Sequence, residues 1–161
     1  MVDVVETGEG PFSTERSGGI SSTVLADFIF SGKYTEGQIR RMLRGQGGLY
    51  AHLGSASALE AEKRAEQGDP HAIMIYSAMA YQVSKWIGAL ATVMKGKVDR
   101  IVLTGGIARS KMLVDWIIER VNFIAPIEIF PGEFEIESMA NGVYRVLTGA
   151  ETAKEYIERE E

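Results

Sequence analysis

No cysteine occurs among the 161 residues of the chain. Its absence excludes thiol catalysis, thiolate metal sites and structural disulfides. It does not fix the compartment, because exported proteins can also lack cysteine, so a cytoplasmic location is only the default expectation. The two histidines, His52 and His71, have no second histidine or cysteine at metal-ligand spacing, and we expect neither to bind a metal.

The chain also lacks an excess of basic residues. It has 17 lysines and arginines against 22 aspartates and glutamates, which gives a formal net charge of −5. Broad nucleic-acid binding normally requires a basic stripe that displaces phosphate counterions, so we expect no nucleic-acid partner. A local phosphate site made by one or two arginines is compatible with this charge.

No segment has the character of a membrane-spanning helix. The most apolar stretch, residues 72–94, contains Ser77, Gln82 and Lys85, which would be costly in lipid and suit a core helix better. Residues 1–5 lack a basic segment followed by an apolar run, so we expect neither a signal peptide nor a membrane partner. The length, with 45% apolar residues, predicts a single globular domain over residues 1–161.

Capping signals divide most of the chain into helices. Thr35 with Gln38 forms a capping box, and Asp69 followed by proline opens another helix. Apolar residues at steps of three and four run through residues 73–94, so the helix that contains them should be buried along most of its length. The predicted helices cover residues 21–30, 36–44, 57–68, 69–95, 111–122, 135–147 and 151–160.

Two short strands are predicted, at residues 100–104 and 127–130, each closed by a turn that contains glycine. The helix predicted between them makes a strand–helix–strand crossover, which places the two strands side by side and parallel. Two strands are few for so many helices. Either the fold is mostly helical, or the sheet continues into strands supplied by other residues; the expected class is α/β.

Glycine-rich loops supply candidate ligand sites. Gly105 and Gly106 follow the first strand, and in open α/β sheets ligands bind beyond the carboxyl ends of the strands. Glycines there let a backbone approach a nucleotide closely, although a strand followed by two glycines is also a common tight turn. Residues 45–48, Gly-Gln-Gly-Gly, form a second loop that is too flexible for a helix and too rich in glycine for a sound strand.

Arg16 lies in residues 8–19, a segment of glycines and small hydroxyl residues with no room for ordinary secondary structure. Its guanidinium is a planar fork of donors that suits a phosphate or a carboxylate, and such a group can neutralise charge on a phosphoryl group in transfer. The alternative interpretation is a loop arginine paired with Glu9 or Glu15.

Three glutamates, Glu133, Glu135 and Glu137, lie at the start of a predicted helix. Carboxylates in this position complement the helix dipole and need no further role. The competing role is to hold magnesium, directly or through water, beside the phosphates of a nucleotide.

Four segments together resemble the C-terminal half of the acetate and butyrate kinase family, in the acetate and sugar kinase, Hsp70 and actin superfamily. They are residues 8–19, 45–54, 102–107 and 130–137. Butyrate-type sequences fit better than acetate-type ones, which usually have Gly-Ile-Gly-Glu-Asn where this chain has Gly-Gly-Ile-Ala-Arg at residues 105–109. The resemblance implies the C-terminal domain of an actin-like ATPase (ribonuclease H-like) fold, helix-rich and with a reduced sheet because the N-terminal half and its first strands are absent.

The resemblance also implies a reaction in which ATP and a short-chain carboxylate such as butyrate give ADP and an acyl phosphate. One departure is the Ser-Ala-Ser of residues 55–57, where family members usually have a threonine, a small polar residue and an aspartate, so any ionic role of that aspartate is lost. The site residues that the resemblance implies are Arg16 for catalysis, Gly47, Gly48, Gly105, Gly106 and Ile107 for ATP or ADP, and Glu135, with Glu133 as the fallback, for Mg²⁺.

Three interpretations follow. In the first, the chain is the nucleotide-side half of a carboxylate kinase, completed by a complementing chain or by the rest of a longer protein. In the second, it is a truncated, non-catalytic nucleotide-binding or oligomerisation module, whose exposed sheet edges favour pairing with another copy. In the third, it serves another phosphotransfer of the superfamily, such as sugar phosphorylation. The first interpretation is favoured by Arg16, Gly105, Gly106 and Glu135. The departure at 55–57 and the missing N-terminal half favour the second, and the butyrate-type segments disfavour the third.

Overall fold

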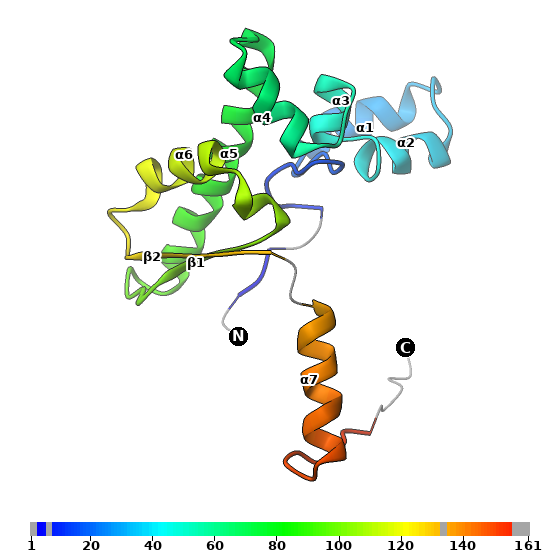
Figure 1. The fold of residues 1–161 in the computed structure, drawn as a ribbon. Coiled ribbons are helices and arrows are strands. Elements are labelled where there is room, and N and C mark those ends of the chain that lie inside the picture. Colours follow the sequence, from blue (N-terminus) through cyan, green and yellow to red (C-terminus); the bar gives the residue numbers. More distant parts are fainter. Residues whose placement is uncertain (1–2, 6–7, 133–134, 156–161) are drawn as a thin grey trace.

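A computed structural model describes residues 3–5, 8–132 and 135–155 of the chain (Figure 1). Its strands are β1 (Ile101–Gly105) and β2 (Ile127–Pro131). Its helices are α1 (Ser22–Phe30), α2 (Glu36–Leu43), α3 (Gly48–Leu53), α4 (Ala58–Glu66), α5 (Pro70–Val93), α6 (Lys111–Val121) and α7 (Glu135–Leu147), with a short 3₁₀ helix, η1 (Gly106–Arg109).

The two strands form the predicted parallel pair. Ile101 of β1 lies opposite Ile127 of β2, and the register continues to Gly105 opposite Pro131. The helix-facing side of the sheet joins the core through Ile101, whereas Val102 on the other side is 53% exposed. Within the described residues the sheet has these two strands, so much of one face is open.

The long helix α5 confirms the predicted start at Asp69, whose side chain accepts hydrogen bonds from the first backbone N–H groups. It packs against α4 and α6 (Figure 1). Its buried residues lie mostly between Ala72 and Ser84, with Tyr76 wholly enclosed. The expectation of burial along most of the helix was wrong at both ends, where Ile73 and Met94 are exposed. The buried face begins one position earlier than the predicted stripe, because the small side chains at 72 and 80 allow close helix packing.

The capping signals at the other helices also match the structure. Thr35 and Gln38 form both hydrogen bonds of the capping box at α2. At the start of α4, the Ser57 side chain accepts from the Glu60 N–H. Ser110 caps α6 in the same way through the N–H of Leu113. These local signals place the predicted helices to within a few residues.

Two of the predicted secondary-structure assignments were wrong. Residues 48–53, expected in a loop, form α3, because Leu49 is fully buried and draws this segment into the core. Residues 151–155, expected at the start of a helix, are not helical. The remainder of that predicted helix, 156–160, lies outside the described residues.

Helix α7 forms where it was predicted, but it stands apart from the rest of the described chain (Figure 1). Large apolar side chains on it are open to solvent, including Ile136 and Leu147, each 80% exposed. Among the described residues, no helix combines the length and apolarity needed to cross a membrane.

Candidate functional site

The segment around Arg16 is a loop closed by its own hydrogen bonds. The Ser13 N–H donates to the Arg16 carbonyl over 3.0 Å, and the Ser13 hydroxyl oxygen accepts from the Arg16 N–H and from Arg16 Nε. Phe12 is buried, and its N–H donates to Gln82 Oε1 of α5 over 3.0 Å, which fixes the loop to the core. At Gly18, with φ of +70°, a Cβ would lie 2.5 Å from the Phe12 nitrogen, so glycine is required for this closure.

Gly47 and Gly48 lie buried beneath this loop. The Gly47 N–H donates to the Glu15 carbonyl over 2.9 Å, and a Cβ on Gly47 would come within 2.5 Å of the Ser17 nitrogen. A Cβ on Gly48 would overlap the Ser13 carbonyl oxygen. The two glycines therefore let the backbone of residues 45–48 approach the Arg16 loop closely, and they determine its position.

A second turn follows β1. Gly105 has φ of +88°, a value that favours glycine, and its carbonyl accepts from the Gly132 N–H over 3.1 Å. The next residues, Gly106 and Ile107, open η1, after which Ser110 caps α6. This arrangement puts the backbone of residues 106–107 at the carboxyl end of the sheet, where ligands bind in open α/β folds.

The Arg16 loop and this turn face one another across a pocket of about 800 Å³. Arg16, Gly106 and Ile107 line it together, although about ninety residues separate them in sequence. The other lining residues are Ser13, Thr14, Glu15, Arg44, Gly45 and Ala58. Gly105 is the neighbour of Gly106 in the same turn, whereas Gly47 and Gly48 lie behind the loop rather than among the lining residues.

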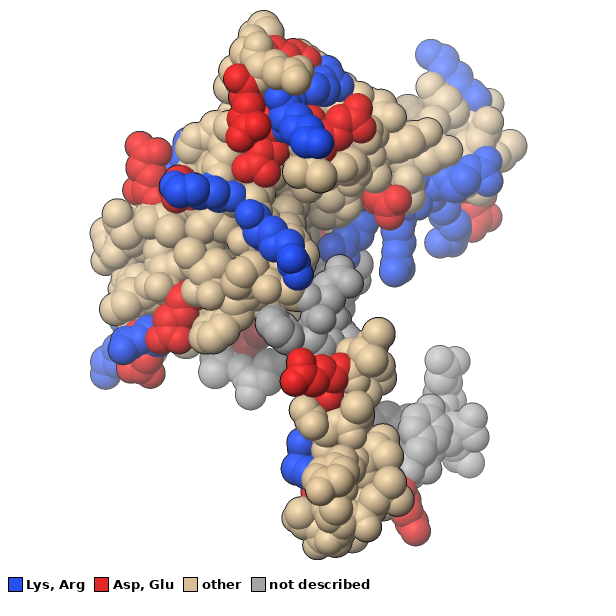
Figure 2. Space-filling view, in the orientation of Figure 1, with Lys and Arg blue, Asp and Glu red and all other residues tan. Residues whose placement is uncertain are grey.

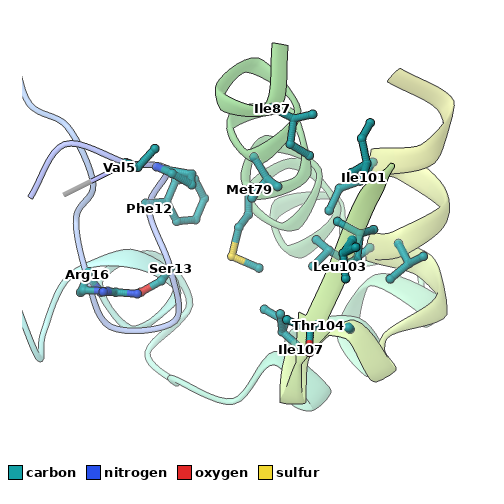
Figure 3. A pocket seen from close by; sticks show the side chains of 18 residues that line it. Val5, Phe12, Ser13, Arg16, Met79, Ile87, Ile101, Leu103, Thr104 and Ile107 are labelled. Carbon is teal, nitrogen blue, oxygen red and sulfur yellow. The ribbon is translucent and has the colours of Figure 1, made fainter. Parts of the chain in front are cut away.

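A more apolar pocket, of about 520 Å³, adjoins the first and shares Ser13, Arg16 and Ile107 with it. Figure 3 shows Arg16 and Ser13 on the loop at one side and Leu103 and Ile107, from β1 and η1, on the other. The arginine thus lies at the junction of a polar and an apolar space.

Comparisons with known proteins show the family to which the chain belongs. The model of the Acetokinase family matches residues 8–138. The chain belongs to the acetokinase family. It is 52% identical over 149 residues to butyrate kinase 2 of Clostridium acetobutylicum, an alignment that covers 92% of this chain and 42% of that relative.

Solved structures of the family show the fold. The acetate kinase of Porphyromonas gingivalis superposes with a TM-score of 0.73 at 19% identity, covering 84% of this chain and 41% of that one. The acetate kinase of Entamoeba histolytica superposes with a TM-score of 0.74 at 16% identity, and the match covers 86% of this chain and 44% of that one. These neighbours confirm the actin-like ATPase fold predicted for the chain. The chain spans about two fifths of the length of these relatives.

The acidic residues predicted for magnesium are placed only in part. Glu135 is the first residue of α7, and the structure describes its backbone but not its side chain. Glu133 lies outside the described residues. In the described part of the chain, no three histidine, aspartate or glutamate side chains gather into a metal-binding group. Within the same part, Arg16 forms no ion pair with Glu9 or Glu15, so the alternative of a paired loop arginine finds no contact to support it.

Two residues near the site were not singled out from the sequence. Arg44 lines the pocket with Arg16. Glu62 of α4 accepts hydrogen bonds at Oε1 from the Ser110 hydroxyl, over 2.9 Å, and from the Met112 N–H, over 3.2 Å. The sequence offers no signal for either, because each acts through a contact with a segment distant along the chain.

A buried phenol lies close to the same helix start. Tyr76 is fully enclosed, and its hydroxyl has no hydrogen-bond partner in the described part of the chain. Burial raises the pKa of Tyr76 to about 12, and the negative charge of Glu62 adds to the shift. Tyr76 is therefore neutral across the physiological range, as a core residue should be.

Proposed function

We propose that this chain supplies the adenosine and magnesium side of the cleft in a carboxylate kinase of the butyrate type. The reaction is ATP plus a short-chain carboxylate giving ADP and an acyl phosphate. The observation that carries the proposal is the shared pocket, which brings the Arg16 guanidinium to the same space as the backbone of Gly106 and Ile107. Membership of the acetokinase family and the likeness to a butyrate kinase support it.

In this proposal Arg16 is the catalytic residue. During transfer, a carboxylate oxygen of the substrate forms a bond to the γ-phosphorus while the bond from that phosphorus to the ADP oxygen breaks. Negative charge on the moving phosphoryl oxygens is neutralised by a guanidinium fork, which matches their geometry. Arg16 is exposed and adjoins the pocket, so it is accessible to such a group.

The nucleoside would lie against Gly105, Gly106 and Ile107. The absence of side chains at two of these positions allows a base or ribose to approach the backbone. Gly47 and Gly48 contribute to nucleotide binding through the Arg16 loop that they support. Their effect on a ligand would therefore appear as a change in the position of Arg16.

Magnesium would be held mostly by the nucleotide phosphates and by water, which is usual for this ion. A carboxylate from Glu135, or from Glu133, is the proposed protein ligand. When bound, the ion would neutralise part of the phosphate charge, and Arg16 would act on the same charge.

The acid substrate and the complete cleft depend on more than this chain, which covers 42% of the butyrate kinase it matches. We propose that a complementing segment or chain closes the cleft, since phosphoryl transfer in such enzymes relies on positioning two substrates in a space that excludes water. The cytoplasm, where ATP is abundant, is the proposed location.

A second candidate function is self-association as a non-catalytic module. The exposed apolar side of α7 favours it, since Ile136, Met139 and Val143 recur at steps of three and four and are each more than half exposed. Sedimentation over a range of concentrations tests this candidate: a dimer that dissociates when Met139 and Val143 are replaced by serine supports it, and a monomer at all concentrations contradicts it.

The nucleotide proposal is tested by titrating the isotopically labelled chain with magnesium ATP while following backbone amide shifts. We expect saturable shifts at residues 105–107 and in the Arg16 loop. The R16Q variant should lose most of the response in its own loop and keep that of residues 105–107. Absence of shifts in the wild-type chain at millimolar nucleotide would contradict autonomous nucleotide binding.

A further inference from the structure

Arg16 has a second arginine beside it. The backbones of Arg16 and Arg44 form an isolated antiparallel bridge, which sets the two residues side by side although 28 positions separate them (44 − 16). The contact is held by neighbouring main-chain bonds: the Ser17 N–H donates to the Leu43 carbonyl over 3.0 Å, and the Gly45 N–H donates to the Glu15 carbonyl over 2.9 Å. Main-chain bonds on both sides of the pair fix its spacing.

Both arginines line the same spaces. Each borders the pocket of about 800 Å³ that Gly106 also lines, and each borders a smaller pocket of about 290 Å³. Figure 3 shows Arg16 lying along the loop beside Ser13, whose hydroxyl accepts from Arg16 Nε over 3.3 Å. Within the described residues this is the one hydrogen bond of the Arg16 guanidinium, which leaves its other donors available there.

Neither arginine is neutralised within the described part of the chain. No carboxylate lies within 4.0 Å of either guanidinium there, even though Glu15 also lines the pocket. Like charges held on adjacent backbone positions repel, and an anion between them would relieve that repulsion. The pair is therefore arranged to accept an oxyanion.

The surroundings strengthen the local positive potential. Residues 33–44 contain Lys33, Arg40, Arg41 and Arg44 against the single acid Glu36, in a chain whose net charge is −5. Figure 2 shows lysine and arginine side chains gathered at the end of the molecule that α1 and α2 form. Such a patch attracts anions toward the pocket.

We propose that Arg44 is a second phosphate-binding residue, which together with Arg16 holds an oxyanion of the phosphate or pyrophosphate class. The inference rests on the proposed function in one respect: the polyphosphate of ATP is the expected source of that anion. The backbone bridge sets the two arginines side by side, and both line the pocket that Gly106 and Ile107 also line. Arg44 therefore contributes affinity for phosphate charge, whatever nucleoside or free anion carries it.

The test uses the whole chain and two probes, pyrophosphate and magnesium ATP, with amide shifts and calorimetry as readouts. Arg44→Gln should weaken pyrophosphate binding about five- to tenfold, the effect of losing one charge-assisted contact at an exposed site. The matched control is Arg41→Gln, which removes the same charge three positions earlier, within α2, at a residue that borders neither of these pockets. We expect the control to change the affinity less than twofold. Arg44→Lys should give an intermediate loss, because it keeps the charge and removes the fork.

The outcomes separate this inference from the proposed function. Equal weakening by the substitutions at 41 and 44, or no weakening at 44, overturns the role of Arg44 even if ATP shifts residues 105–107. Pyrophosphate binding that depends on Arg44, without any ATP response at residues 105–107, supports the anion site and contradicts the proposed nucleotide role. A wild-type chain that binds neither probe contradicts both. If Arg44→Gln loses its folded amide spectrum, Arg44→Lys decides the question. Wild-type affinity for pyrophosphate in Arg44→Lys would contradict a role for the planar guanidinium of Arg44.

Discussion

The Ser110 hydroxyl donates a hydrogen bond to Glu62 Oε1 over 2.9 Å, and so ties the start of α6 to α4. The same oxygen accepts from the Met112 N–H over 3.2 Å. Ser110 directly follows η1, the turn that presents Gly106 and Ile107 to the pocket. One carboxylate on α4 therefore holds the backbone that we propose lies against the nucleoside.

Replacing Glu62 with glutamine should loosen that turn. The amide can still accept one bond, but it loses the negative charge that favours the N-terminus of α6 and strengthens both contacts. We expect the free energy of unfolding to fall by about 1–2 kcal/mol and the amides of residues 106–110 to exchange faster with solvent. Urea unfolding and hydrogen exchange measure the two effects. Glu66→Gln, at the exposed end of the same helix, is the control and should change stability by less than about 0.5 kcal/mol.

Gly48→Ala should displace the Arg16 loop. Gly48 has φ of +55°, and an added Cβ would overlap the Ser13 carbonyl oxygen, so the substitution combines backbone strain with a steric clash. The control is Gly54→Ala, where φ is +76° but a Cβ would meet nothing within 4 Å. The control isolates the backbone cost, about 1–2 kcal/mol. Gly48→Ala should exceed this cost and shift the amides of residues 13–17; equal destabilisation in both variants would show that the loop is not closely packed.

Tyr76→Phe tests the unpartnered buried phenol. Because burial raises the pKa of Tyr76 to about 12 from about 10 in the unfolded chain, ionisation of this phenol favours the unfolded chain, and the full stability of the fold is present below pH 10. Stability is therefore lost as the pH rises from 10 through 12, by about 1.4 kcal/mol for each pH unit between the two pKa values. The variant should equal or exceed the wild type in stability at pH 7, since it removes a hydroxyl without a partner. The difference between the two proteins over pH 8–11.5, from chemical denaturation, isolates this group; a constant difference would contradict the assignment.

The sequence predicted those features that depend on neighbours in the chain. The capping pair Thr35 and Gln38 and the two β-branched strands rely on local geometry, and both are in the structure. Helix α3 was missed because the glycines at 45–48 give weak helix signals, and only the tertiary burial of Leu49 reveals why the segment is helical. The exposed apolar face of α7 could not be foreseen either, since periodicity predicts an amphipathic helix and says nothing of what covers it.

The site divides in the same way. Arg16 and the turn after β1 were identified from residue type and from the resemblance, and the pocket brings them together. The resemblance implies that Gly47 and Gly48 bind a nucleotide, and this stays a prediction; the structure adds their close backbone approach to the Arg16 loop. Arg44 could not be found from the sequence, because its relation to Arg16 is a backbone bridge between distant segments. Such pairings require the tertiary structure.

The junction between α4 and α5 should make the chain sensitive to acid. Asp69 Oδ2 accepts from Arg64 Nη2 over 2.7 Å and from Arg64 Nε over 2.9 Å, and Oδ1 accepts from the backbone N–H groups of His71 and Ala72. The hydrogen bond from Arg64 lowers the pKa of Asp69, and the Ala72 N–H lowers it further. A carboxyl whose pKa is lower in the folded state stabilises the fold above its unfolded pKa, near 4. That stabilisation is lost as the pH falls through the lower folded value.

Asp69→Asn keeps a residue that caps helices well but removes the charge, so its stability should vary less with pH than that of the wild type below pH 4. Arg64→Gln removes the cationic partner of Asp69, so the stability of this variant should also vary less with pH below pH 4. Urea midpoints at pH 7, 5, 4 and 3 give the comparison. If Asp69→Asn retains the wild-type loss between pH 4 and pH 3, the acid sensitivity arises elsewhere and the Arg64–Asp69 pair is only a surface contact. If both variants flatten the curve to the same extent, the pair acts as a unit, because each substitution alone removes the whole interaction.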